Sequence, residues 1–123
     1  MKREIGDYVQ DIVEAMNNAM EFTNDMAYGE FVQNTKTIYA VVRAIEIVGE
    51  TVKNIPEEIR KKYPEIPWRQ MAGMRDKLIH EYFGVQLERV WETAKRDIPN
   101  LKPLFEKMLS DLEKSNRKPL KNL

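Results

Sequence analysis

The chain has 123 residues and a mass of 14.5 kDa, which is the size of a single domain. Its 20 Lys and Arg residues balance 20 Asp and Glu residues, so phosphate binding would need a local basic patch rather than a global excess of positive charge. The absence of cysteine excludes disulfides, zinc fingers, thiol catalysis and iron–sulfur clusters. With one histidine, a metal site would depend on carboxylates and would suit Mg²⁺ or Mn²⁺ more than Zn²⁺.

Composition also predicts the compartment and the domain organisation. Hydrophobic residues make up 42% of the chain and charged residues 33%, which is typical of a folded cytosolic protein. The N-terminal MKREIGDYVQDIVEA lacks the apolar segment of a signal peptide, and no run of about 18 apolar residues could span a membrane. We therefore expect a cytoplasmic protein without membrane contact, with one helical domain over residues 1–114 and a basic, flexible tail over residues 115–123.

Apolar periodicity predicts two long helices in the first half of the chain. An amphipathic helix is expected over residues 4–23, followed by the turn-rich joint TNDMAYGE over residues 23–30. A second long helix is expected over residues 31–54, because apolar residues return there in alternating steps of four and three.

Prolines divide the second half of the chain. Pro56 and the two glutamates after it predict the start of a short helix. Three further helices are expected over residues 67–82, 86–96 and 101–114. Pro99 is expected to break the chain between the last two. Because no alternating strand pattern is present, the sequence predicts an all-α, antiparallel bundle of four to five helices.

The stretch MRDKLIHEYFGV, residues 74–85, contains the only histidine. On a helical wheel Arg75 falls within the apolar arc of the third long helix, where a guanidinium needs a partner, an interface or a cleft. His80 lies about 140° from Arg75 around an ideal helix, and Tyr82 about 200° from His80. Simple helical spacing therefore does not place Arg75 and His80 on one face. Both could reach one site if the helix frays or bends near its end or if the site is wide, and a two-fold dimer could also supply one residue from each copy.

These residue types suit RNA cleavage without a metal. If the ribose 2′-hydroxyl is the nucleophile, His80 can move the proton and Arg75 can hold the phosphorane oxygens. The residues alone leave a structural explanation open, in which His80 is a favourable charge partner at a helix C-terminus. A metal-dependent hydrolase built on the acids of the first two helices is disfavoured, because those helices carry no helical carboxylate–histidine pair.

The segment RDKLIHEY has the form Arg-x4-His-x-Tyr and resembles the motif of the HEPN superfamily. Together with the preceding IPW-x-x-M-x-G-x-R block, it resembles the HepT-type toxins of minimal-nucleotidyltransferase/HEPN toxin–antitoxin systems, over almost the whole chain. The resemblance implies a HEPN-like bundle that forms a homodimer through the motif helix, with both motifs facing one cleft. It also implies a type VII-like toxin, a metal-independent endoribonuclease that needs no cofactor and uses Arg75 and His80 as catalytic residues.

A partner and a regulated residue are implied as well. A cognate minimal nucleotidyltransferase antitoxin would transfer AMP to Tyr82, and Asp76 would support the motif by orienting Arg75 or His80. The alternative is a non-catalytic HEPN subunit that binds a nucleotidyltransferase or a nucleotide, with Tyr82 as a core or interface aromatic. The RNA substrate would lie along the locally basic segment 53–77, for which a solvated charged surface is the competing explanation.

Overall fold

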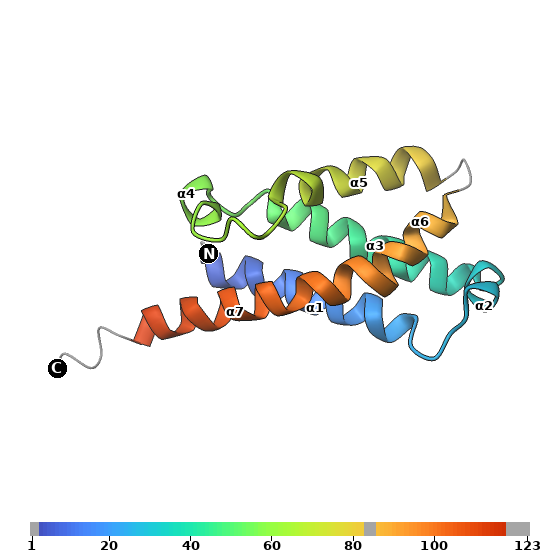
Figure 1. Ribbon diagram of the computed structural model, residues 1–123, viewed down its shortest axis with the longest axis horizontal. Helices are drawn as coiled ribbons and strands as arrows, with labels where there is room; N and C mark the ends of the chain where they lie inside the picture. The colour runs from blue at the N-terminus through green and yellow to red at the C-terminus, as the bar shows by residue number, and fades with distance from the viewer. Residues whose placement is uncertain (1–2, 83–85, 118–123) are drawn as a thin grey trace.

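The computed structural model describes residues 3–82 and 86–117, and for Arg75, residues 77–82 and residues 116–117 it describes the backbone without the side chains. This part of the chain is helical and contains no strand (Figure 1). Its elements are α1 (Ile5–Phe22), α2 (Tyr28–Val32), α3 (Thr35–Val52), α4 (Glu57–Arg60), α5 (Trp68–Tyr82), α6 (Leu87–Glu92), the π-helix η1 (Thr93–Asp97) and α7 (Ile98–Arg117). The predicted all-α fold is thereby confirmed.

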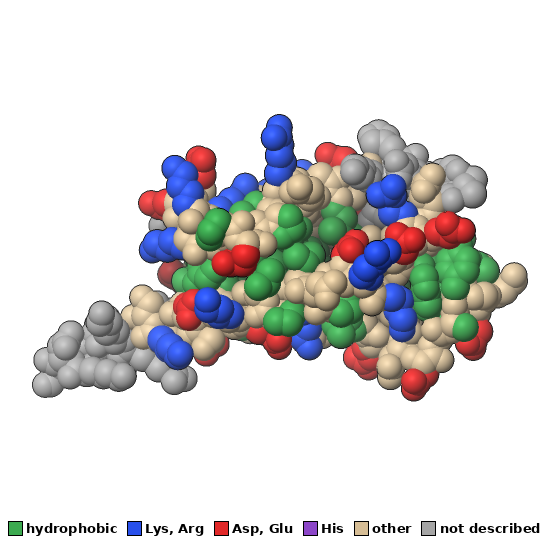
Figure 2. Space-filling model, viewed as in Figure 1, with side chains coloured by type: hydrophobic (Ala, Val, Ile, Leu, Met, Phe, Trp, Pro, Cys, Tyr) green, Lys and Arg blue, Asp and Glu red, His purple; other side chains and the backbone are tan. Residues whose placement is uncertain are grey.

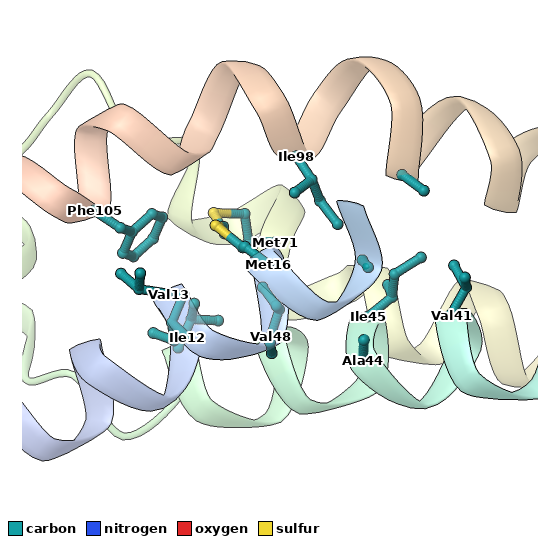
Figure 3. Close-up of a cluster of buried hydrophobic side chains, with 14 of the residues drawn as sticks. Ile12, Val13, Met16, Val41, Ala44, Ile45, Val48, Met71, Ile98 and Phe105 are labelled. Atoms are coloured by element: carbon teal, nitrogen blue, oxygen red, sulfur yellow. The ribbon is translucent and has the colours of Figure 1, made fainter. Parts of the chain in front are cut away.

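The bundle of the described residues is built from four long helical segments, namely α1, α3, α5 and the run from α6 through η1 to α7. α1 packs against both α3 and α7, and α5 packs against α3 (Figure 1). Apolar side chains from all four segments meet in one core (Figure 3). Its largest fully buried members include Ile12, Met16, Phe31, Ile45, Ile55, Met71, Ile98, Phe105 and Met108. No helix in the described ranges is long and apolar enough to cross a bilayer.

Local sequence explains the position of α1, which lies within one residue of its predicted bounds at each end. The backbone N–H of Glu4 donates to Asp7 Oδ2 at 3.0 Å, so a backbone donor at the helix start has a side-chain acceptor. The carboxylate of Asp7 also lies in the first turn, where the helix dipole favours negative charge. Apolar residues at three- and four-residue steps turn one side of the helix into the core.

The predicted single helix over residues 31–54 is wrong at its N-terminal end, because α2 ends at Val32 and α3 begins at Thr35. Asn34 caps α3, and its Oδ1 accepts a hydrogen bond from the N–H of Thr37 at 3.0 Å. Phe31 and Ile38 are both buried on either side of this break. The apolar spacing continues across it, and for that reason periodicity alone did not reveal it.

The prediction that Pro99 separates two helices is also wrong, because α6, η1 and α7 follow one another without interruption. The N–H of Ile98 donates to the carbonyl of Thr93, which is the wider hydrogen-bond step of a π-helix. Pro99 is the second residue of α7 and directly follows this change of register. Its missing N–H therefore falls where the regular hydrogen-bond ladder is already interrupted.

The connection from α3 to α5 is held by side chains that bond to backbone carbonyls. Arg60 donates from Nε to the carbonyl of Ile55 at 2.8 Å and from Nη2 to that of Val52 at 2.9 Å, which covers the C-terminal end of α3. Trp68 Nε1 donates to the carbonyls of Arg60 and Tyr63 at 3.2 and 3.1 Å. These bonds hold the first residue of α5 beside the end of α3, one residue after the predicted start.

Candidate functional site

The Arg-x4-His-x-Tyr motif lies in the C-terminal half of α5, whose backbone is helical through Tyr82. The predicted catalytic residues Arg75 and His80 and the predicted modification site Tyr82 therefore share one helix. Their side chains lie outside the described part of the chain, so the approach of one to another stays a prediction. The side chain of Asp76, the predicted supporting residue, is exposed.

The N-terminal half of α5 is anchored in the core. The rings of Trp68 and Phe105 meet edge to face, with centroids 5.6 Å apart, and join α5 to α7. Met71, one turn later, is 1% exposed. The motif therefore continues from a helix whose first turns are fixed in direction by packing.

One side of α5 borders an apolar groove, which lies between α5 and the start of α7. The groove has a volume of about 220 Å³, and its lining residues are Pro67, Gln70, Met71, Met74, Asp97, Asn100 and Leu101. Figure 2 shows hydrophobic side chains reaching the surface between these two helices. Met74 directly precedes Arg75, so this partly uncovered apolar strip extends to the beginning of the motif.

A second groove lies between α4 and the start of α5, and basic residues dominate its lining. It is wider and shallower, with a volume of about 500 Å³, and it is lined by Glu57, Arg60, Lys61, Trp68, Arg69 and Ala72. Lys and Arg side chains gather over α4 and the first turns of α5 in Figure 2, with acidic side chains among them. The sequence indicated a basic segment here, but the groove depends on the bonds that bring α4 and α5 together.

The described residues contain one tyrosine with a clearly shifted pKa, and it lies outside the motif. Tyr63 is partly buried and its Oη donates to Asp111 Oδ2 at 2.8 Å. Burial, followed by the hydrogen bond and the negative charge of Asp111, raises the pKa of Tyr63 to about 12. This hydrogen bond links α7 to the loop that precedes α5, which is a structural role.

Groups of three or more His, Cys, Asp or Glu side chains that could hold a metal ion do not occur among the described residues. Among the acids of α1, Asp11 pairs with Arg3 Nη2 at 2.8 Å in an exposed ion pair.

Comparison with known proteins identifies the family. The family described as "Ribonuclease HepT-like" matches residues 12–108. "Putative RNase MJ0125" and "Putative RNase MJ1216" of Methanocaldococcus jannaschii are each 54% identical to the chain over 112 residues, which is 91% of this chain and 97% and 93% of theirs. "Probable ribonuclease HepT" of Thermococcus cleftensis is 53% identical over 108 residues, or 88% of this chain and 98% of that protein. No solved structure matches the chain significantly. The chain therefore belongs to the HepT-like ribonuclease family.

Proposed function

We propose that this protein is an endoribonuclease toxin in which Arg75 and His80 cut RNA without a metal or a cofactor. The proposal is carried by the Arg-x4-His-x-Tyr motif on α5 of a chain that belongs to the HepT-like ribonuclease family. The toxin would be one half of a type VII-like toxin–antitoxin pair, in which a minimal nucleotidyltransferase is the antitoxin.

The proposed reaction uses a nucleophile that the RNA itself supplies. The ribose 2′-oxygen attacks the adjacent phosphorus, and the 5′-oxygen of the next nucleotide leaves. The products are a 2′,3′-cyclic phosphate and a 5′-hydroxyl end. His80 transfers the proton between the 2′-hydroxyl and the leaving oxygen, and Arg75 stabilises the charge that develops on the non-bridging oxygens. Asp76 would orient one of these two side chains.

We further propose that the active form is a homodimer in which two copies of α5 meet. Arg75 and His80 are about 140° apart around their helix, so one helix directs them to different sides. The apolar groove beside α5 offers surface that a second copy would cover. A two-fold axis would then bring Arg75 of one protomer near His80 of the other.

The activity is tested with purified protein and RNA in the presence of EDTA. Arg75→Ala and His80→Ala should each reduce cleavage by about 10²-fold or more, whereas Ser110→Ala, an exposed change on α7 outside both grooves, should have no such effect. Circular dichroism and size-exclusion chromatography must show that each variant keeps its fold and oligomeric state. A wild-type protein that binds a nucleotidyltransferase but never cuts RNA would instead support a non-catalytic subunit.

Tyr82 is the proposed point of control. Its phenolic oxygen would attack the α-phosphorus of ATP in the nucleotidyltransferase, with loss of the phenolic proton and release of pyrophosphate. The AMP group adds bulk and negative charge beside the motif, which would obstruct and repel an RNA phosphate.

Intact-mass spectrometry of the protein expressed with and without its candidate antitoxin tests this control. We expect a gain of one or more AMP units, mapped to Tyr82, only when the antitoxin is present. The Tyr82→Phe variant should stay unmodified and should remain toxic beside the antitoxin. Neutralisation of that variant would show that the two proteins act by forming a complex rather than by AMP transfer.

A further inference from the structure

We propose that the basic groove between α4 and α5 binds the phosphate backbone of single-stranded RNA and leads the strand toward the motif. The inference rests on the proposed ribonuclease function and adds the place where the substrate is held. The groove is lined by three cations, Arg60, Lys61 and Arg69, and by the single carboxylate of Glu57. A concave surface with an excess of positive charge is the kind of site that a nucleic-acid backbone occupies.

Two of these cations are available to a ligand. Lys61 and Arg69 are exposed, and neither forms an ion pair with another described residue. By contrast, three other exposed arginines, Arg3, Arg43 and Arg96, each form an ion pair with an acid, as Arg43 does with Glu50 at 3.7 Å. Because their charges are not neutralised in this way, Lys61 and Arg69 can contact phosphate oxygens without first losing a protein partner.

The third cation has a different role. Two nitrogens of Arg60 donate to the carbonyls of Val52, the last residue of α3, and of Ile55, three residues later. The guanidinium carbon lies 5.8 Å from the centre of the Trp68 ring. Arg60 is therefore fixed in place and contributes charge to the groove without being free to move. The Trp68 indole is held by its own hydrogen bonds. These contacts make the groove a preformed surface.

The direction of α5 connects this groove to the motif. Trp68 and Arg75 are seven residues apart, which is about two turns or 10 Å along a helix, and positions with this spacing lie on the same side. The same spacing relates Arg69 to Asp76. A strand held at the groove and continuing along α5 would thus reach the backbone position of Arg75 within a few nucleotides.

A different groove in the same molecule supplies a matched control. It has a volume of about 470 Å³ and is lined by Phe22, Asn34, Lys36, Thr37 and Ala40, so it contains one cation in place of three. It lies at the other end of α3, beside α2 (Figure 1). Lys36→Ala combined with Lys107→Ala, an exposed site on α7, removes the same charge as Lys61→Ala combined with Arg69→Ala.

The experiment measures binding separately from cleavage. A labelled single-stranded 2′-O-methyl RNA oligonucleotide, which lacks the nucleophilic hydroxyl, is titrated with each protein by fluorescence anisotropy over a range of salt concentrations. For the Lys61→Ala/Arg69→Ala protein we expect affinity to fall about tenfold at low salt and the slope of log Kd against log salt to fall by about 1.4. The Lys36→Ala/Lys107→Ala protein should resemble wild type.

Each outcome decides between the proposals. If both double variants bind RNA with equal affinity, the proposed RNA-binding role of the groove is wrong. The same follows if the wild-type protein binds no RNA. A groove variant that keeps its RNA affinity but loses its complex with the candidate nucleotidyltransferase would make the groove a protein-binding surface. The wild-type protein could also bind RNA through the groove and yet never cut ordinary RNA. That result would support the RNA-binding role of the groove and contradict the proposed ribonuclease function.

Discussion

Single residues distant from the motif help to hold α5 in position, and Tyr63 is the clearest example. It lies between α4 and α5, and its hydrogen bond to Asp111 on α7 spans 48 residues of sequence. The fold favours the neutral phenol, because burial and the adjacent carboxylate raise the pKa of Tyr63 to about 12.

This shift predicts a loss of stability at high pH. An unfolded tyrosine ionises near its ordinary pKa of 10.0, whereas folded Tyr63 keeps its proton until about pH 12. The contribution of the Tyr63 hydroxyl to the free energy of unfolding is therefore fully present below the pKa of the unfolded state, and it is lost as the pH rises through the pKa of the folded state. Urea unfolding followed by circular dichroism should show a falling free energy of unfolding between these two pH values.

The Tyr63→Phe variant tests whether Tyr63 causes this loss of stability at high pH. Near neutral pH it should be less stable than wild type by about 1 kcal/mol, because the hydrogen bond to Asp111 is lost. Between the two pKa values its free energy of unfolding should fall less steeply, so that the gap to wild type narrows. If both proteins lose stability in parallel over that range, the assignment to Tyr63 is wrong.

At the scale of elements, the boundaries depend on individual caps and on one change of hydrogen-bond register. Asn34 separates α2 from α3 although the apolar pattern continues across both. The π-helix η1 joins α6 to α7, and the helix continues through Pro99, the second residue of α7, although proline normally ends a helix. In both places hydrogen bonding, rather than apolar spacing, decides where a helix begins or continues.

The cap can be tested directly. Asn34→Ala should lower the free energy of unfolding by about 1 kcal/mol, because the N–H of Thr37 loses its acceptor. Asn34→Asp should retain most of the stability, since a carboxylate also caps well. Gln33→Ala, an exposed neighbour, is the control and should change stability by about 0.5 kcal/mol or less. Equal losses in Asn34→Ala and Gln33→Ala would contradict a specific capping role.

For the whole molecule, the arrangement of α5 matters most. It packs on α3, with an apolar groove on its α7 side and a basic groove on its α4 side. We propose a different occupant for each surface, a second copy of the chain on the apolar side and RNA on the basic side. The division gives the proposed dimer and the proposed substrate separate surfaces on one helix.

Mixing inactive variants tests whether the site is shared between protomers. In a dimer of Arg75→Ala and His80→Ala chains, one composite site lacks both residues and the other keeps both. After random exchange of subunits we expect recovery of about a quarter of wild-type cleavage, since half of the dimers are mixed and each has one intact site. The unmixed variants, carried through the same exchange, are the controls. No recovery despite proven mixed dimers would show that each site is formed within one protomer.

Much of the fold was predictable because its signals are local. Steps of three and four residues placed α1 and most of α3, and prolines placed α4 and the start of α5. The motif residues were recognisable because Arg-x4-His-x-Tyr, together with the IPW-x-x-M-x-G-x-R block before it, resembles a known family motif. The start of α3 and the continuity from α6 to α7 were not, because a capping hydrogen bond and a change of register decide them.

The sequence by itself determined an all-α chain with Arg75, His80 and Tyr82 on its third long helix, since helical period and motif spacing are properties of neighbouring residues. Only the tertiary structure decided what surrounds that helix. Arg60 reaches back to α3, Trp68 packs on Phe105 of α7, and both grooves arise between elements that the linear order does not place together. The physical reason is that burial and hydrogen bonding act between residues far apart in the chain, whereas periodicity reports only on residues within a few turns of one another.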